Sequence, residues 1–312
     1  MFAAAQAGAQ TLNLPPRPTG APTGTQFTNI ITPMSLTERE NWIYAQVVNG
    51  NVPNFQRTLV PVSVNATING TRHTATYYAA ADYLAIGTDA DYFLEPTTPL
   101  LAQRLCNVLG CTLPTRKMVN QIWTNAAVKL NPQPIPPSGD MVTVPVFAQE
   151  NYMVQTQRNT FTNSFPLGAL VSGDKKDVIL STMIYTNFDN PPITDPVVIY
   201  GWLYTTGVPI QPIYNGHENT YADYSHGIRL VQNALTVDGN PNTITNVFTN
   251  PNLAALLSDE GPSEGTTSSG VILVPHYTIS PLAPVIINVE VGTPVARRPP
   301  HRSRRAVFPH QM

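Results

Sequence analysis

Residues 59–78, LVPVSVNATINGTRHTATYY, contain the pattern that decides the fold of this chain. Apolar and polar side chains alternate on both sides of Asn69-Gly70, with the period of two that a half-buried β-strand requires. An Asn-Gly pair readily adopts the positive φ angles of a two-residue hairpin turn. The stretch therefore predicts a long β-hairpin that turns at Asn69-Gly70.

Three helices are predicted on either side of the hairpin. Residues 35–50 begin with a capping box of Ser35 and Glu38 and end at an Asn-Gly pair. Residues 98–110 begin with Thr-Pro and stop at a glycine. Residues 115–126 begin with a threonine cap and carry one apolar face. Each segment therefore has both a start and an apolar surface to pack against the rest of the protein.

After residue 140 the sequence becomes rich in short apolar or alternating runs. Pro, Gly and Asn separate these runs, as is typical of strands joined by turns. The runs are 141–147, 177–185, 196–204, 227–239, 270–279 and 283–292. A further helix is predicted within residues 250–261. The chain is therefore expected to be an α+β protein, with helices concentrated in the N-terminal half and mainly antiparallel β-sheet in the C-terminal half.

The chain divides into four predicted parts. Residues 1–33, rich in Pro, Gly and Thr, are expected to form an extended N-terminal arm, and residues 34–131 a helix-rich part that includes the hairpin. Residues 132–294 form a β-rich part that carries the candidate site, either as a second domain or as one domain with 34–131. The proline-rich stretch 131–140 lies between these two parts. Residues 295–312 form a basic C-terminal tail.

The composition favours a globular protein outside the cytosol. Charged residues are 12% of the 312 residues, well below the roughly 25% of an average soluble domain, while Asn, Thr and Pro are abundant. We therefore expect a secreted or envelope-associated protein, extracellular or in the cell envelope. The net charge of −2 creates no field that attracts nucleic acid, so specific nucleic-acid binding is not expected. The sequence has no run of about 18 apolar residues, and no transmembrane segment is expected.

The C-terminal tail, by contrast, is strongly cationic. Its arginines leave 12 basic and 19 acidic residues in the rest of the chain. They are Arg297, Arg298, Arg302, Arg304 and Arg305. Such a Pro-spaced tail is typically disordered, and its charge would allow docking to a polyanion or trimming by a protease. Whether the tail is ordered or removed stays open at this point.

The segment GHENTYADYSHGIRLV, residues 216–231, is the candidate catalytic site. It holds His217, Asp223, Ser225 and His226 in a loop that enters a predicted strand. A neutral histidine accepts a proton near physiological pH, and a carboxylate beside it orients the ring and stabilises its charged form. The segment therefore predicts general acid/base chemistry by the two histidines, with Asp223 or Glu218 as the orienting carboxylate. A polar turn whose side chains only satisfy backbone groups is the alternative.

Substrate-binding groups are predicted in and near the same segment. Tyr224 and Arg229 belong to it, and the four charges of residues 174–177 include Lys175 and Lys176. If this turn lies beside the second histidine, a lysine and Arg229 could hold a carboxylate or sulfate of a substrate. A solvated turn with local ion pairs is the simpler expectation.

The letters SHGIRL, residues 225–230, resemble the SHGCIRL box around the nucleophile of the L,D-transpeptidases that cross-link bacterial cell walls. The cysteine of that box would stand between Gly227 and Ile228, and it is missing here. Because no thiol stands at this place to form an acyl-enzyme, transpeptidation by this segment is excluded. The resemblance implies a cell-wall substrate, and membership of that family is not inferred from it.

A metal site is a further interpretation of the same histidines. His217 and His226 would supply two ligands for zinc or another divalent metal, and no other cofactor is predicted. The third ligand would come from a distant part of the chain, such as His73, His276 or Asp177. The helical His-Glu-x-x-His spacing of many zinc hydrolases is absent from the sequence.

The two cysteines, Cys106 and Cys111, exclude a disulfide scaffold and a four-cysteine zinc module. Cys111 precedes the helix predicted from Thr115, where a thiol can have a lowered pKa and act with a histidine as base. A small buried side chain or a disulfide between the two cysteines is the simpler expectation.

Three classes of function follow from these features. A secreted or envelope-associated hydrolase that uses the His/Asp loop on cell-wall peptide or polysaccharide is favoured, so the expected substrate is a polymer or a peptide. A non-enzymatic structural or binding protein, such as a capsid-like or surface-layer subunit that forms homo-oligomers, is the alternative, because low charge, an extended arm and a basic tail suit assembly. A metal-dependent lyase or oxidase comes third.

Overall fold

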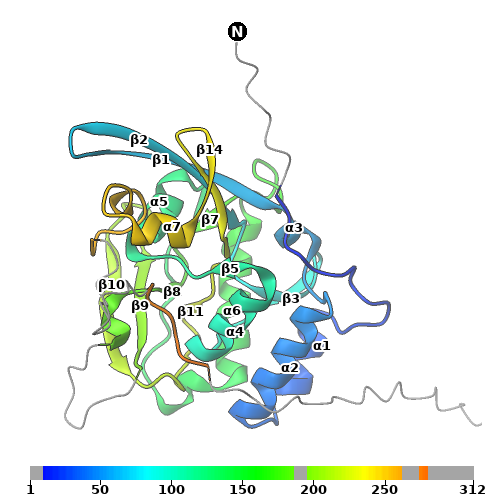
Figure 1. Ribbon diagram of the computed structural model, residues 1–312. Coiled ribbons are helices and arrows are strands. Elements are labelled where there is room, and N and C mark those ends of the chain that lie inside the picture. Colours follow the sequence, from blue (N-terminus) through cyan, green and yellow to red (C-terminus); the bar gives the residue numbers. More distant parts are fainter. Residues whose placement is uncertain (1–9, 186–194, 262–273, 280–312) are drawn as a thin grey trace, which may run out of the picture. The chain divides into compact units, whose positions relative to one another are not determined.

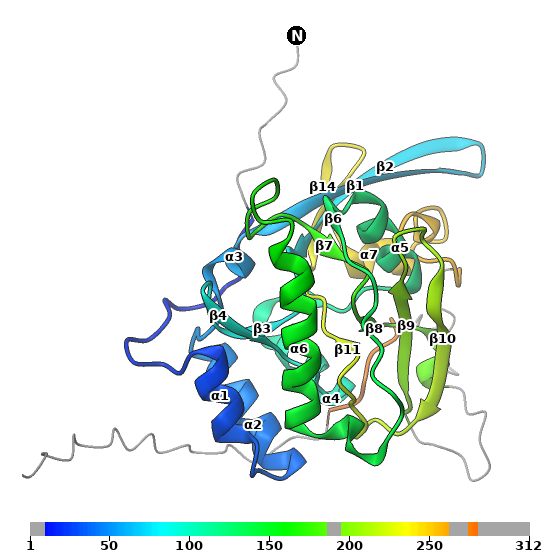
Figure 2. The same cartoon turned by 180° about the vertical axis from the view of Figure 1, so that it is seen from behind.

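Figures 1 and 2 show the computed structural model of the chain, which describes residues 10–185, 195–261 and 274–279. Within these ranges the helices lie mostly in the N-terminal half, and strands, mostly antiparallel, dominate the later part. The prediction of an α+β fold is confirmed. The basic tail and the strand expected over residues 283–292 lie outside the described residues.

The predicted hairpin is present and has the expected turn. Strands β1 (Leu59–Ile68) and β2 (Thr71–Ala80) pair antiparallel over their full length. Asn69 and Gly70 have φ angles of 49° and 79°, the left-handed values that this turn requires. The tip of the hairpin extends past the neighbouring elements in both views (Figures 1 and 2).

One sheet is built around β2. β1 pairs along one edge of β2, and β12 and β13 share the other edge. The further strands of this sheet are β5 (Cys111–Thr112), β12 (Val231–Gln232), β13 (Ala234–Val237) and β14 (Asn240–Thr243), in the order β14-β13-β2-β12-β5. The hairpin therefore joins the last described strands to an early part of the chain.

A second sheet carries the candidate site. The β11–β8 pair in this sheet is parallel and aligns His226 with Lys176, so residues 174–177 lie beside the second histidine. The strands are β8 (Lys176–Val178), β9 (Val197–Leu203), β10 (Pro209–His217) and β11 (His226–Gly227), in the order β10-β9-β8-β11. Two short pairs are β3 (Ala85–Thr88) with β4 (Asp91–Leu94), and β6 (Val128–Lys129) with β7 (Val171–Ser172).

The three predicted helices are present with the predicted caps. Ser35, Thr98 and Thr115 precede them, and their hydroxyls accept hydrogen bonds from the first helical turn. Glu38 completes the first capping box, because it also accepts the Ser35 N–H. The helices are α2 (Leu36–Val48), α4 (Pro99–Leu109) and α5 (Arg116–Asn125), and a single turn, α3 (Asn54–Arg57), follows α2.

Residues 24–31 differ from the expected extended arm. They form α1 (Gly24–Ile31), which starts with a capping box of Thr23 and Gln26. Phe27 and Ile31 are fully buried one turn apart, so this helix belongs to the core. The prolines and glycines before residue 24 dominate the composition of the segment and conceal the short helical pattern.

Residues 141–147 are not a strand, although their alternation predicted one. They contain the end of a 3-10 turn, η1 (Gly139–Val142), and the start of the long helix α6 (Val144–Asn159). Seven residues are too few to separate a period of two from a helical period. The residues that α6 buries follow a helical spacing but include two charged side chains, so hydrophobicity does not reveal the helix; they are Val144, Phe147, Glu150, Val154 and Arg158.

Three later segments also differ from the expectation. Residues 177–185 leave β8 and enter a 3-10 turn, η2 (Thr182–Tyr185). The helix expected within residues 250–261 is a 3-10 turn, η3 (Ala254–Leu256), and the α-helix α7 (Ile244–Thr249) precedes it. Residues 274–279 form no strand.

Helix α6 connects the N-terminal helices with the second sheet. It packs against α1, and both views place it between the α1–α2 pair and strands β8–β10 (Figures 1 and 2). Lys175, directly before β8, reaches Glu150 of α6 through a buried ion pair. The candidate site therefore lies against the middle of the longest described helix.

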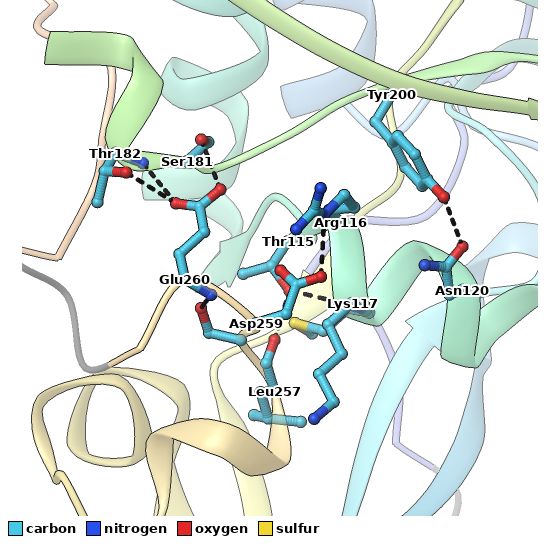
Figure 3. A network of polar contacts seen from close by, with 12 residues as sticks. Thr115, Arg116, Lys117, Asn120, Ser181, Thr182, Tyr200, Leu257, Asp259 and Glu260 are labelled. Carbon is cyan, nitrogen blue, oxygen red and sulfur yellow. Dashed lines mark hydrogen bonds and ion pairs between the residues drawn. The ribbon is translucent and has the colours of Figure 1, made fainter. Parts of the chain in front are cut away.

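A polar network holds residues 254–260, which we call the latch segment, on the N-terminal half of α5 (Figure 3). Thr115, Lys117 and Gln121 donate hydrogen bonds to the backbone carbonyls of residues 257, 255 and 256. Arg116 Nε lies 2.9 Å from Asp259 Oδ2. The bonds to the carbonyls satisfy backbone groups that the short 3-10 turn leaves open.

Glu260 extends the latch segment to the turn after β8 (Figure 3). Its carboxylate accepts the hydroxyl of Ser181 at 2.7 Å, the N–H of Thr182 at 2.8 Å and the hydroxyl of Thr182 at 3.0 Å. Three bonds to one carboxylate fix the end of the latch segment in place.

Candidate functional site

The site loop, residues 218–225, joins β10 to β11 and has the two predicted histidines at its ends. His217 is the last residue of β10, and His226 is the first of β11. Tyr221 lies between them: its ring stacks on His217 with centroids 4.0 Å apart and meets the His226 ring edge-on at 5.7 Å. The two histidines are thus linked through a tyrosine that the sequence analysis did not single out.

His226 is fully buried, yet its ring is not tied into the structure by hydrogen bonds. Neither Nδ1 nor Nε2 has a hydrogen-bond partner among the described residues. Burial lowers the pKa of His226 to about 4, although the neighbouring Asp223 opposes this shift. The imidazole is therefore neutral at physiological pH and has a lone pair that can accept a proton.

Asp223 is the carboxylate beside His226. Its Oδ1 accepts the Ser225 N–H at 2.8 Å and the Ser225 hydroxyl at 2.5 Å, and its Oδ2 accepts the Tyr221 hydroxyl at 3.1 Å. Burial disfavours the charged form, but the charges of His226 and Lys176 and the bonds from Ser225 outweigh it and lower the pKa of Asp223 to about 2. Asp223 is therefore an ionised group held in a fixed position.

Ser225 supports Asp223 rather than His226. Its side chain is fully buried, and its hydroxyl donates to the carboxylate. A serine nucleophile requires a hydroxyl that is bonded to the base and open to the substrate. The geometry therefore favours a positioning role for Ser225 over the role of nucleophile.

A cavity of about 450 Å³ lies beside the site loop, and we call it the Tyr221 cavity. Thr220, Tyr221 and Ala222 of the site loop line it, together with Leu36 and Arg39 of α2. Its volume is within the range of small-molecule sites. Tyr221 thus lines the cavity and also contacts the His226 ring, so it connects the buried imidazole with the cavity wall.

Arg39 supplies a cation at this cavity. Its side chain is buried, its guanidinium lies 5.1 Å from the centre of the Phe147 ring, and its Nε has no partner within the described ranges. The charges of Glu40 and Glu95 stabilise the guanidinium, but burial is the stronger effect and lowers its pKa. Arg39 keeps its charge because arginine titrates far above physiological pH.

A second cavity of about 450 Å³ adjoins the first. Leu36 and Thr220 line both cavities, and Asn219 of the site loop lines the second. Arg104 of α4 also lines it, so we call it the Arg104 cavity. Two cavities with shared walls suit a ligand that extends over both of them, as a segment of a polymer does.

The turn of residues 174–177 is buried, so the expectation of a solvated turn is wrong. Three of its four charged side chains are at most 2% exposed. Lys175 Nζ lies 2.5 Å from Glu150 Oε2 and donates to the Tyr224 carbonyl at 2.8 Å. A buried ammonium requires such partners, because an isolated charge in the interior is costly. Lys175 is therefore a buried structural residue that connects α6 with the site loop.

Arg229 is also internal, although we expected it to bind substrate. It is fully buried and donates to the backbone carbonyls of Ala80 and Val171 at 3.0 and 2.8 Å. Its guanidinium lies 4.0 Å from the centre of the Tyr83 ring. These contacts join β2, β7 and the segment after β11, so the observed arrangement is structural.

Tyr224 lies in the site loop and Lys176 begins β8, and the contacts found for their side chains are with other parts of the fold. The Tyr224 hydroxyl donates to the Ile135 carbonyl at 3.1 Å and accepts the Ile135 N–H at 2.8 Å. Lys176 Nζ lies 4.9 Å from the centre of the Trp202 ring, and burial lowers its pKa. Neither residue lines the two cavities in this conformation.

A set of buried acids below the site was not predicted from the sequence. Both carboxylate oxygens of Asp174 lack partners within the described part of the chain. Burial, followed by the charges of Asp82 and Glu150, raises the pKa of Asp174 to about 8. Burial also raises the pKa of Asp177 to about 7. Such perturbed groups cluster at functional sites more often than elsewhere.

Gly227 allows β11 to lie close to β8. A Cβ atom at this position would be 2.5 Å from Cδ1 of Tyr83 and 2.7 Å from Cβ of Lys175. Real side chains do not tolerate such distances, so the backbone beside His226 requires a glycine. The glycine in the motif SHGIRL thus has a steric explanation.

The cysteines are free, buried thiols and form no disulfide. Burial raises the pKa of Cys111 to about 12, and burial raises that of Cys106 as well. The lowered thiol pKa that a helix N-terminus could produce is therefore not observed. Cys111 packs as a small hydrophobic side chain, as the simpler expectation held.

The distant residues considered as third metal ligands have other contacts. His73 Nδ1 lies 2.6 Å from Asp238 Oδ2, His276 contacts Tyr185, and Asp177 accepts the Tyr83 hydroxyl at 2.9 Å. Over residues 10–185, 195–261 and 274–279, no group of three or more His, Cys, Asp or Glu side chains is arranged to hold a metal ion. Zinc at His217 and His226 stays a prediction.

None of the helices in the described ranges is both long and apolar enough to cross a membrane. Comparison of the chain with protein-family models, curated proteins and solved structures found no match. The function of the protein is therefore inferred from the chemistry and geometry of the site itself.

Proposed function

We propose that the protein is a hydrolase that acts on a polymeric cell-wall substrate, with His226 as its general base. The observation that carries this proposal is the neutral imidazole of His226, which has no hydrogen-bond partner among the described residues. It contacts the ring of Tyr221, which lines the Tyr221 cavity. A buried imidazole without hydrogen bonds adds little to stability, so proton transfer is the better explanation for its presence.

In the proposed reaction, His226 takes a proton from a water molecule. The hydroxide adds to the carbonyl carbon of a peptide bond, and the ionised Asp223 stabilises the imidazolium that forms. The imidazolium then gives its proton to the leaving amine as the C–N bond breaks. On a polysaccharide, the same base would direct water to the anomeric carbon. Water is the proposed nucleophile because the hydroxyl of Ser225 is committed to Asp223.

Arg39 is proposed to stabilise the oxyanion of this reaction. It lines the Tyr221 cavity, and its Nε has no acceptor among the residues that the structure describes. A fixed cation in a largely buried site lowers the energy of a developing negative charge more than it would in water. The cation Arg39 therefore lines the cavity, and the base His226 contacts Tyr221 of the cavity wall.

Tyr221 and His217 are proposed to control access to His226. Because the imidazole is fully buried, the Tyr221 ring must move before water and substrate reach it. His217 stacks on that ring and holds the closed position. His217 is then a positioning residue, and His226 is the catalytic one.

The location outside the cytosol is part of this proposal, and it is supported by the low fraction of charged residues. Docking of the C-terminal arginines to an anionic polymer stays a prediction, as does homo-oligomer formation. A non-enzymatic surface subunit is the alternative that the following experiment separates from the hydrolase.

The test is incubation of the purified protein with purified peptidoglycan, followed by mass spectrometry of the soluble fragments. The proposal expects the wild type to release fragments and His226→Gln to do so at least about 100-fold more slowly, the usual loss when a general base is removed. Arg72→Gln, on the exposed face of β2, serves as control and should match the wild type. Equal release by wild type and His226→Gln, or none by either, would contradict the proposal.

A further inference from the structure

The Arg104 cavity contains a cation that the structure leaves without an acceptor. Arg104 lies on α4, and its guanidinium is 3.5 Å from the centre of the Tyr44 ring, on α2. Within the described ranges it makes no hydrogen bond and no ion pair, while it lines a cavity of about 450 Å³. A guanidinium that lies over a ring keeps its N–H groups available for a carboxylate, which it can bind by two parallel hydrogen bonds.

An anion lines the same cavity. Asp195 is half-buried and forms no ion pair with Arg104 or with any other described cation. Glu40 also lines the cavity, but Thr98 already occupies its carboxylate, since the N–H and the hydroxyl of Thr98 donate to it at 2.7 and 2.9 Å. In the described part of the chain, the cavity thus has a cation without an acceptor, Arg104, and an acidic side chain without a cation, Asp195, while the Glu40 carboxylate is held by Thr98.

The other walls of the cavity are of two kinds. Leu36, Leu100, Leu101 and Ile279 are apolar, and Asn41 and Asn219 carry amides. An apolar wall next to separated charges suits an aliphatic group attached to a zwitterion. A simple anion or a simple ammonium would leave one of the two charges without a partner in a partly desolvated place.

We propose that the Arg104 cavity binds an α-amino-acid group whose carboxylate and ammonium are both free, with Arg104 on the carboxylate and Asp195 on the ammonium. This inference rests on the proposed function, which it deepens, because the cavity adjoins the Tyr221 cavity through Leu36 and Thr220. It selects a peptide polymer over a polysaccharide as the substrate, and it requires that the α-amino-acid group is attached through its side chain, because a main-chain end has only one of the two charges free. The side-chain-linked α-amino-acid group occupies the Arg104 cavity, and the bond to be cleaved lies at the Tyr221 cavity.

The test measures binding by calorimetry and needs no turnover. The probes are leucine, N-acetylleucine, which lacks the ammonium, and leucinamide, which lacks the carboxylate. Leucine should bind the wild type about tenfold or more tightly than either derivative, because each derivative loses a charge-assisted hydrogen bond. Equal binding of the three compounds, or no binding of leucine, would overturn the inference without any variant.

Variants then assign the charges. Arg104→Gln should lower the affinity for leucine at least about tenfold and leave the affinity for leucinamide unchanged. Asp195→Asn should lower the affinity for leucine and leave the affinity for N-acetylleucine unchanged. Arg72→Gln is the matched control for the loss of an arginine. Unchanged affinity of Arg104→Gln for leucine would contradict the assignment.

The two proposals fail separately in this design. His226→Gln should bind leucine like the wild type, because the Arg104 cavity does not include His226. Binding of leucine without any peptidoglycan fragments would refute the hydrolase and keep the binding site. Release of fragments without leucine binding would refute the binding site and keep the hydrolase.

Discussion

Lys175 Nζ and Glu150 Oε2 lie 2.5 Å apart, and both side chains are at most 1% exposed. Removal of one side chain leaves the other as an unpaired charge in the interior. Lys175→Met should therefore lower the free energy of unfolding by about 3–5 kcal/mol. Chemical denaturation at pH 7 measures this loss. The double variant Lys175→Met with Glu150→Gln should recover a large part of it.

The exposed pair of Arg116 and Asp259 is the matched control for the buried pair. These side chains are 33% and 35% exposed at a distance of 2.9 Å. Because water screens them, Arg116→Gln should cost less than about 1 kcal/mol. If both pairs cost the same, burial is not what makes the Lys175 pair important.

Asp174 should make stability depend on pH. Its pKa, raised from 3.8 to about 8, means that the folded state binds the proton more tightly than the unfolded chain. Its contribution is therefore complete below a pH of about 4 and is lost progressively as the pH rises to about 8. Asp174→Asn is neutral at every pH, so its melting temperature relative to the wild type should rise between pH 5 and pH 8.5. A constant difference over this range would show that Asp174 titrates normally.

Glu260 should stabilise the latch segment through its three hydrogen bonds. Glu260→Gln weakens charge-assisted bonds to Ser181 and Thr182, and we expect a loss of about 1–3 kcal/mol in the free energy of unfolding. Hydrogen exchange of the amides of residues 254–260 should become faster. Asp259→Asn, which alters one exposed ion pair, is the control and should have a smaller effect.

His226 should matter for activity and little for stability. Because neither ring nitrogen is bonded within the described chain, His226→Gln should change the free energy of unfolding at pH 7 by less than about 1 kcal/mol. Thermal and chemical unfolding measure this directly. A loss above about 3 kcal/mol would instead identify the imidazole as a structural strut.

The elements that were predicted correctly from the sequence are those whose formation depends on residues close together in the chain. The Asn69-Gly70 turn and the capping threonines Thr98 and Thr115 depend on neighbours within four residues, and all three appear where expected. Helix α6 was not predicted, because its first residues alternate like a strand and its buried face includes the charged Glu150 and Arg158. Helix α1 was missed because its short apolar face follows a proline-rich stretch.

The candidate site was predicted in part. The sequence brought His217, Asp223 and His226 together because they lie in one loop, and the conditional expectation that residues 174–177 lie beside His226 agrees with the β11–β8 pairing. The inward direction of Lys175 could not be predicted, since its partner Glu150 lies on a helix that the sequence analysis did not identify.

The residues that line the cavities came from distant segments. Arg39 and Arg104 lie on α2 and α4, and only the fold places them next to the site loop. Nothing in their local sequence separates them from ordinary helical arginines on a solvated face. Tyr221 lies within the candidate segment, but its contact with both histidines depends on the course of the loop.

The most direct test of the account is the pH dependence of peptidoglycan fragment release by the wild type. A base with the pKa of about 4 given by burial of His226 predicts a constant rate from pH 8 to pH 5 and a decline with a midpoint near pH 4. Activity regained after return to pH 7 separates this decline from unfolding. A midpoint near pH 6.5, the ordinary value of an exposed histidine, or an unchanged profile in His226→Gln, would contradict the account.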